Sequence, residues 1–118
     1  AEIEDAVAMD HEVVESAAVG IPHDLKGQGL VVFVVPKEEG VFPPSAVNRA
    51  VAAGVGRYAV PEKIYVVRDL PKTRSGKIVR RLLRKIAMHD LEGLGDLSTL
   101  ADPDIVPELI ALVKAQAA

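Results

Sequence analysis

The sequence predicts an α+β domain in which helices pack on a small three-stranded β-sheet. The chain has 118 residues, of which 49% are hydrophobic, so it can bury one compact core and should fold as a single unit. Three segments rich in β-branched residues, 13–21, 29–37 and 63–70, are bounded by Gly or Pro, which is typical of strands. Apolar residues at helical spacing occur before, between and after these segments.

The first part of the chain is predicted to contain one helix and two strands. The opening AEIEDAVAMD places Ile3, Ala6 and Val7 on one face, and its early acidic residues suit a helix N-terminus. The strand GLVVFVVPK is apolar on both faces, so we expect it at the centre of the sheet. A loop, PHDLKGQG, should connect it to the preceding strand VVESAAVGI. We expect Gly27 and Gly29 to shape this loop rather than bind phosphate, because no helix directly follows them.

Three more helices are predicted along the rest of the chain. The segment PPSAVNRAVAAGV begins with Pro-Pro-Ser, a favourable helix start, and repeats apolar residues at helical spacing. The strand KIYVVRDL ends at Pro71, which cannot donate to a ladder. Residues 76–87 then form an amphipathic helix, with Ser75 or Thr73 as the expected N-cap. The Gly- and Asp-rich EGLGDLSTLADPD should be irregular, and the last helix should start near Asp104.

Basic residues are concentrated in one segment of an otherwise acidic chain. Seven of the 14 Lys and Arg residues lie between Lys72 and Lys85, where there is no Asp or Glu, although the net charge is −3. A general polyanion binder needs a positive field over much of its surface, so any phosphate site should be confined to this segment. We therefore expect no nucleic-acid partner.

Three features that the sequence lacks limit the kinds of site and partner to be expected. The chain has no cysteine, which excludes disulfides and thiolate metal sites and is consistent with a cytoplasmic protein. Its longest apolar run, residues 30–35, is far shorter than the roughly 20 residues of a membrane helix, so no membrane partner is expected. His11, His23 and His89 share no metal-ligand spacing and should lie in loops or at the surface.

Two interpretations of the basic segment are open at this point. A surface helix with a solvated basic face would explain its arginines, and such a helix, residues 76–87, could dock a non-catalytic module on an acidic partner or nucleic acid. The preceding KTRSGK instead indicates an anion site, because it places three cations where a helix dipole disfavours positive charge. A P-loop is excluded, since Pro71 occupies its first Gly position and Ile78 follows Lys77.

The motif LPKTRSGKIVRR resembles the last signature of the adenylate-forming superfamily of acyl-CoA synthetases, peptide-synthetase adenylation domains and luciferases. AEIEDAV is similar to the start of the C-terminal domain of these enzymes, and LGDLSTLADPDIVPELI resembles the tail of acetyl-CoA and propionyl-CoA synthetases. The resemblance implies that residues 1–118 are the mobile C-terminal domain of an AMP-forming acyl-CoA synthetase. The hinge and the N-terminal ATP- and acyl-binding domain would precede Ala1.

This resemblance implies a ligase that activates a short-chain carboxylate with ATP to acyl-AMP and then transfers the acyl group to CoA. Lys77 would be the catalytic lysine, carried on a motif loop with the residues Thr73, Arg74, Ser75 and Gly76. Lys77 would also be a target of reversible acetylation, with an acetyltransferase and a deacetylase as partners. ATP, Mg²⁺ and CoA would bind the full-length enzyme, whereas the isolated domain should be inactive and hold no cofactor.

The resemblance implies two further sites. Ala52 occupies the position of an Arg that contacts the CoA nucleotide, so Arg49 and Arg57 are the candidates to replace it, and a different mode of CoA binding is the alternative. A magnesium ion would lie in the turn after the first helix, at Ala8, Asp10 and Val13. Asp10 is a suitable hard oxygen ligand, although a single carboxylate in a turn is more often simply solvated.

Overall fold

The computed structural model describes residues 2–10, 12–23, 27–38, 43, 45–56 and 61–116. Its elements follow the predicted order: α1 (Glu2–Ala8), β1 (Val13–His23), β2 (Gly27–Pro36), α2 (Ser45–Gly54), β3 (Lys63–Val66), α3 (Arg80–Ala87) and α4 (Ile105–Gln116). The predicted α+β class is confirmed. No helix in the described ranges has the length and apolar character needed to cross a bilayer.

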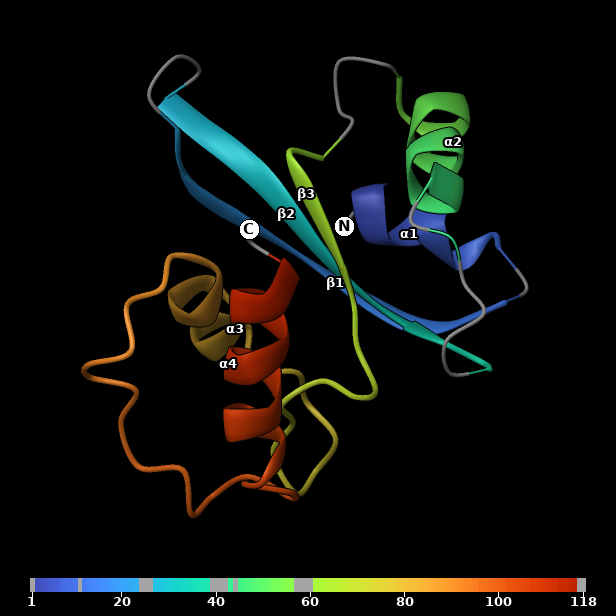
Figure 1. The fold of residues 1–118 in the computed structure, drawn as a ribbon. Coiled ribbons are helices and arrows are strands. Elements are labelled where there is room, and N and C mark those ends of the chain that lie inside the picture. The colour runs from blue at the N-terminus through green and yellow to red at the C-terminus, as the bar shows by residue number, and fades with distance from the viewer. Residues whose placement is uncertain are drawn as a thin grey trace.

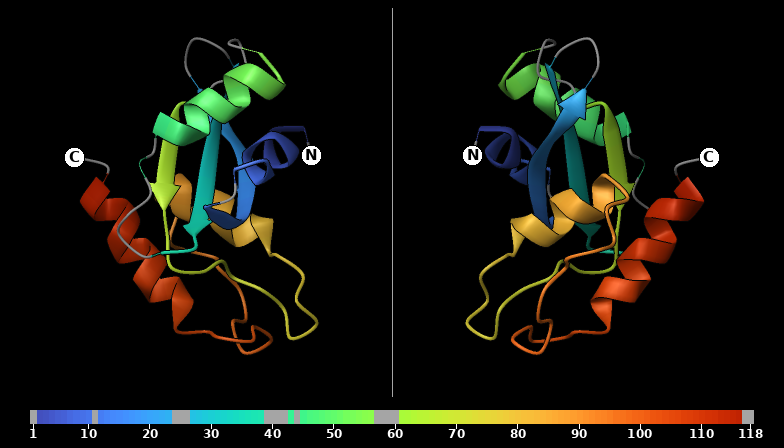
Figure 2. Two further views of the ribbon diagram at one scale, coloured as in Figure 1. Left: turned by 90° about the vertical axis from the view of Figure 1, so that its right-hand side faces the viewer. Right: turned by 90° about the vertical axis from the view of Figure 1, so that its left-hand side faces the viewer.

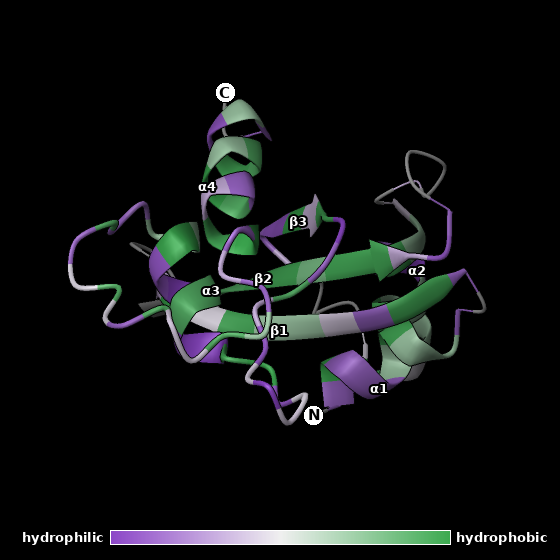
Figure 3. Ribbon diagram, turned by 90° about the horizontal axis from the view of Figure 1, so that it is seen from below, coloured by the Kyte–Doolittle hydropathy of each residue, from purple (hydrophilic) through white to green (hydrophobic). Residues whose placement is uncertain are grey.

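The sheet has the strand order β1-β2-β3, with β2 at its centre as predicted. β1 pairs with β2 in the antiparallel direction, with Ala17 opposite Phe33, and β2 pairs with β3 in parallel, with Phe33 opposite Tyr65. Residues 31–35 of β2 are all buried, and Figure 3 shows hydrophobic colour along most of this strand. The strand is apolar on both faces because both faces are covered.

In the described part of the chain, α1 and α2 cover one face of the sheet and α3 and α4 cover the other, which gives three layers (Figures 1 and 2). On one face, α1 and α2 pack on Val32 and Val34 of β2. On the other face, α3 and α4 pack on a larger cluster that includes Phe33 and Tyr65, whose ring centroids are 5.3 Å apart. The alternation of side chains along β2 thus divides its residues between two hydrophobic clusters.

The two antiparallel strands extend further into the predicted loop than expected. Gly27 and Gly29 are paired residues of β2, opposite His23 and Ile21, so the prediction that they shape the connection is wrong. Their backbone groups join the sheet instead, which the sequence pattern did not reveal because glycine is rare in strands. The remaining predicted loop residues, 24–26, are outside the described ranges.

The third strand is shorter than the predicted segment 63–70. Val67 still donates to the carbonyl of Val34 at 2.9 Å, but the chain then leaves the sheet. Arg68 bonds to Glu108 of α4, 2.8 Å away, and the Asp69 carboxylate accepts the amide hydrogen of Leu70. These polar contacts turn the chain away from the sheet and towards α4.

Helix α3 begins at Arg80 rather than at residue 76, so the predicted caps Thr73 and Ser75 are wrong. Its N-cap residue is Val79, which makes no side-chain capping bond. The Thr73 hydroxyl instead accepts the amide hydrogen of Lys77 at 3.2 Å and bonds to the Ser75 hydroxyl at 2.9 Å. Both hydroxyls are therefore used inside the loop that precedes the helix.

Candidate functional site

Residues 72–78, the motif loop, form a tight hairpin between β3 and α3. Lys72 and Ile78 make an isolated antiparallel bridge at its base. Within it, the Thr73 amide donates to the Lys77 carbonyl and the Gly76 amide donates to the Thr73 carbonyl, each at 2.9 Å. The loop is therefore ordered by its own backbone, and its tip from Arg74 to Lys77 is exposed.

Gly76 is required at the tip of the motif loop by the backbone conformation. Its φ of +92° lies in the region that side-chain-bearing residues rarely adopt. A Cβ atom added at this position would meet nothing within 4 Å, so space is not the constraint. The glycine allows the chain to reverse direction immediately before Lys77.

Lys77 differs from the other basic residues of its segment in having an unpaired head group. Among the described residues, its ammonium takes part in no hydrogen bond or ion pair, and its side chain is exposed. The other six cations each contact an acceptor within the chain: Lys72, Arg74, Arg80, Arg81, Arg84 and Lys85. The ammonium of Lys77 is thus available to anions outside the described chain.

The arginines of α3 are occupied by contacts to other elements. Arg80 forms an ion pair with Glu4 of α1, Arg81 donates to the Leu94 carbonyl, and Arg84 donates to the Gly20 carbonyl of β1. Burial raises the pKa of Glu4, but bonds from Arg80 and the Ala18 amide outweigh it, so the pKa lies below its ordinary value. This basic face ties the fold together, which disfavours its use as a free docking surface.

The base of the motif loop is anchored by Lys72. Its ammonium lies 2.5 Å from a carboxylate oxygen of Glu15 in β1 and 3.1 Å from one of Asp69. The close contacts with the carboxylates of Glu15 and Asp69 raise the pKa of Lys72 above its ordinary value. Lys72 is therefore structural, whereas Lys77 is the lysine of the loop that has no partner in the described ranges.

The anion site expected at a helix N-terminus is not formed as predicted. Since α3 starts at Arg80, Lys77 and Gly76 lie in a hairpin before the helix rather than in its first turn. The loop offers a cation on an exposed tip in place of a cradle of amides. It can therefore contribute to a site only where another part of a protein supplies the remaining walls.

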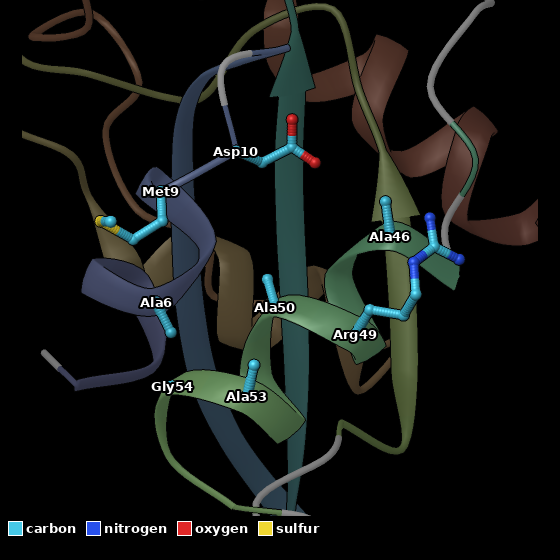
Figure 4. A pocket seen from close by; sticks show the side chains of 8 residues that line it. All are labelled: Ala6, Met9, Asp10, Ala46, Arg49, Ala50, Ala53 and Gly54. Atoms are coloured by element: carbon cyan, nitrogen blue, oxygen red, sulfur yellow. The ribbon is translucent and has the colours of Figure 1, made fainter.

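A cavity of about 500 Å³ lies between α1 and α2, on the other face of the sheet from α3 (Figure 4). Small apolar residues form most of its wall, and Arg49 and Asp10 add one positive and one negative group. The guanidinium of Arg49 is exposed and makes one long contact, 3.4 Å, to the Ser45 hydroxyl. Sequence reasoning selected Arg49 and Asp10 separately and did not predict that they line one cavity.

The predicted metal residues lie around the turn between α1 and β1: Ala8 ends α1, Asp10 lies in the turn and Val13 begins β1. Val13 donates to the Asp10 carbonyl at 3.1 Å, and one oxygen of the Asp10 carboxylate accepts the Glu12 amide hydrogen at 2.9 Å. The second carboxylate oxygen and nearby backbone carbonyls are hard oxygen donors of the kind Mg²⁺ accepts. In the described ranges, no three His, Cys, Asp or Glu side chains gather in a metal-binding group.

The remaining sequence candidates are dispersed. Ala52 is a partly buried residue of α2, and His89 is exposed after α3 with a φ of 58°. His23 is the last residue of β1 rather than a loop residue. Arg57 and His11 are outside the described residues.

Comparisons with known proteins agree with the architecture around this loop. Residues 2–77 match the family model of the AMP-binding enzyme C-terminal domain. The chain is 51% identical to "Acetyl-coenzyme A synthetase 2" of Pseudomonas putida over 93% of its length, and 47% identical to the human "Acetyl-coenzyme A synthetase 2-like, mitochondrial" over 95%. These matches span only 18% and 17% of the respective relatives.

A solved structure, that of the Brucella canis acyl-CoA synthetase, is similar with a TM-score of 0.68 and 30% identity. It covers 77% of this chain, which in turn covers 17% of that protein. The family match ends at residue 77, whereas the acetyl-coenzyme A synthetases align over nearly the whole chain. The similarity to the acetyl-coenzyme A synthetases therefore extends beyond residue 77, into α3, the irregular segment and α4.

Proposed function

Because the chain belongs to the AMP-binding enzyme C-terminal domain family, we propose that it is the lysine-bearing domain of an AMP-forming acyl-CoA synthetase. Its substrates would be ATP, a short-chain carboxylate and CoA. The ATP- and acyl-binding pockets would belong to a larger N-terminal domain of the same enzyme, which is the partner of this domain. The isolated domain would be inactive.

The observation that carries the proposal is the ammonium of Lys77, which has no partner among the residues that the structure describes. It stands at the exposed tip of a Gly-containing hairpin, while the neighbouring cations are held by acceptors within the chain. A carboxylate that attacks the α-phosphate of ATP brings two anions together. A cation between them reduces their repulsion and stabilises the charge of the transition state.

The reaction has two steps. A carboxylate oxygen bonds to the α-phosphorus, and the bond to pyrophosphate breaks, which gives acyl-AMP. The thiolate sulfur of CoA then bonds to the acyl carbon, and AMP leaves with the electron pair of the broken bond. Lys77 would act in the first step only, and the domain would rotate away before the second, which explains why this residue is carried on a small separate domain.

The proposal includes Mg²⁺ and CoA sites in this domain. Asp10 would hold Mg²⁺ with the backbone carbonyls of Ala8 and Val13, and the ion would supply positive charge that neutralises phosphate oxygens. Arg49, in the cavity between α1 and α2, would contact the phosphates of CoA in place of the missing Arg at Ala52. Arg57 is the second candidate for that role.

We also propose that Lys77 is controlled by reversible acetylation. Its side chain is exposed and unpaired within the described chain, so an acetyltransferase could reach the amine. Acetylation removes the charge and with it the electrostatic contribution to adenylation. If the protein from cells lacking the deacetylase carries no acetyl group at Lys77 by mass spectrometry, this part of the proposal is wrong.

A cytoplasmic location of the protein also remains a prediction.

The test of the main proposal is carboxylate-dependent exchange of pyrophosphate into ATP by the full-length protein. The wild type should catalyse exchange with acetate or propionate, and Lys77→Ala should not. Lys114→Ala, which removes another exposed lysine, is the control and should behave like the wild type. An absence of exchange in the wild type with every short-chain acid tested would refute the proposal. A docking module would instead bind RNA or DNA with strong salt dependence.

A further inference from the structure

A stretch of the irregular segment, residues 97–101, pairs with the motif loop; we call it the tail segment. Leu100 and Thr73 form an antiparallel bridge, and the Ala101 amide donates to the Lys72 carbonyl at 2.9 Å. Arg74 also reaches the Ser98 carbonyl, at 3.5 Å. Figures 1 and 2 show the orange tail segment beside the yellow loop, although about 20 residues and α3 separate them in the sequence. The tail segment therefore borders the loop through one bridge residue and two hydrogen bonds.

The tail segment is fixed by contacts that do not involve the loop. Leu100 is 3% exposed and belongs to the hydrophobic cluster under α3 and α4, and Leu97 packs against the same cluster. At one side, the Asp96 carboxylate accepts the Ser98 amide hydrogen at 2.9 Å. At the other side, the Asp102 carboxylate lies 3.5 Å from the Arg68 guanidinium. The tail segment is thus anchored to the core independently of the loop it borders.

The tip of the motif loop has few anchors of its own by comparison, although Lys72 and Ile78 hold the base of the loop. Its tip is exposed from Arg74 to Lys77 and buries no apolar side chain. A short hairpin alone is only marginally stable in water. The bridge from Thr73 to Leu100 and the bond from the Ala101 amide to the Lys72 carbonyl connect the first residues of the loop to the buried core. The tail segment therefore lowers the conformational freedom of the backbone that carries Lys77.

We propose that the tail segment positions Lys77 for adenylation, with Leu100 and Ala101 as positioning residues that touch no substrate. This inference rests on the proposed function. A misplacement of a catalytic group by about 1 Å can lower a rate by about 10²-fold, so loss of the tail contacts should slow the ATP-dependent step. Thioester formation, which does not use Lys77, should be unaffected.

The experiment compares Leu100→Ala with Leu109→Ala in the full-length protein. Both leucines are buried in the same hydrophobic cluster, but Leu109 lies on α4 and makes no bridge to the motif loop. We expect Leu100→Ala to lower the kcat of adenylation at least about tenfold, with little change in KM for ATP. Leu109→Ala should cost similar stability and leave the ratio of adenylation to thioester formation unchanged. Leu100→Met should restore most of the rate.

A second variant tests the backbone bond without a cavity in the core. Ala101→Pro removes the amide hydrogen that the Lys72 carbonyl accepts, and it leaves the buried Leu100 side chain in place. Ala101→Ser keeps the amide and is the control. Ala101→Pro should slow adenylation and speed hydrogen exchange at the Thr73 amide, but not at the Phe33 amide of β2. Ala101→Ser should change neither.

The possible outcomes separate this inference from the proposed function. Equal slowing by Leu100→Ala and Leu109→Ala, or unchanged adenylation in Ala101→Pro while Lys77→Ala is inactive, would overturn the positioning role and leave the proposed function intact. Unchanged adenylation in Lys77→Ala would overturn the proposed function itself. In that case, hydrogen exchange at the Thr73 amide would still show whether the tail segment orders the loop.

Discussion

Glu4 and Arg80 form an ion pair that closes over the free edge of β1. They are 76 residues apart in the sequence, on α1 and α3, which cover opposite faces of the sheet. The same Glu4 carboxylate accepts the outward-pointing amide hydrogen of Ala18 at 3.0 Å. Two residues further along β1, Arg84 donates to the Gly20 carbonyl at 3.1 Å. Charged side chains therefore occupy an edge that would otherwise be open to strand pairing.

This edge contact predicts that Glu4→Gln lowers the free energy of unfolding by about 1 kcal/mol or more, because it weakens charged hydrogen bonds to Arg80 and Ala18. Urea unfolding measures the change. Glu2→Gln is the control, since Glu2 is an exposed residue of the same helix and should change stability by less than about 0.5 kcal/mol. Equal effects of the two substitutions would contradict the role of the ion pair.

The same carboxylate predicts a dependence of stability on pH. The pKa of Glu4 is lower in the folded chain than in the unfolded one, so the unfolded state binds the proton more tightly. The Glu4 carboxylate therefore stabilises the fold above its unfolded pKa, near 4.3, and this stabilisation is lost as the pH falls through the folded pKa. The stability difference between wild type and Glu4→Gln should therefore shrink below about pH 4. If the stability difference between the two proteins stays constant from pH 7 to 3, the lowered pKa of Glu4 does not contribute to stability.

Gly76→Ala should lower the free energy of unfolding by about 1–2 kcal/mol, because a φ of +92° strains a residue with a Cβ atom. The space around the position is free, so the cost comes from the backbone alone. Gly76→Asn should cost less, since asparagine tolerates positive φ better than alanine. Thermal unfolding of the wild type, Gly76→Asn and Gly76→Ala measures their order of stability, which should fall in that sequence. A destabilisation by Asn as large as that by Ala would contradict this explanation.

At Gly54, the last residue of α2, we expect a substitution to be destabilising through a steric clash rather than through backbone strain. A Cβ atom there would lie 2.9 Å from the Cβ of Ala6 on α1, so Gly54→Ala must displace one of the two helices. We expect a loss of about 1–3 kcal/mol. Ala6→Gly removes the opposing atom, so the double variant should be more stable than the sum of the two single effects. A double-mutant cycle with no coupling energy would show that the helices relax without cost.

The sequence predicted those parts of the fold in which local pattern decides the structure. The apolar pattern on both faces of β2 predicts its central place in the sheet, which the strand order confirms. The role of Lys77 is instead implied by the resemblance of its motif to a family signature. The start of α3 was misplaced because the hydroxyls of Thr73 and Ser75 can bond either to a helix amide or to loop groups, as they do here. Only tertiary structure distinguishes these alternatives.

Other features depend on contacts between distant residues. The parallel pairing of β2 with β3 and the bridge between Thr73 and Leu100 have no local signature, since residues 97–101 follow neither a helical nor a strand period. The basic face of α3 was ambiguous for the same reason. A charge pattern does not show that Arg80 meets Glu4 or that Arg84 meets the edge of β1.

The most direct test of the account measures the two half-reactions separately in full-length Lys77→Ala, with Lys114→Ala as the control. Acyl-AMP formation from ATP and carboxylate should fall by about 10²-fold or more, because the ammonium is lost from between two anions. Thioester formation from supplied acyl-AMP and CoA should stay within about twofold of the wild-type rate. Acyl-AMP formation at the wild-type rate, or an equal fall in both steps, would contradict the role of Lys77.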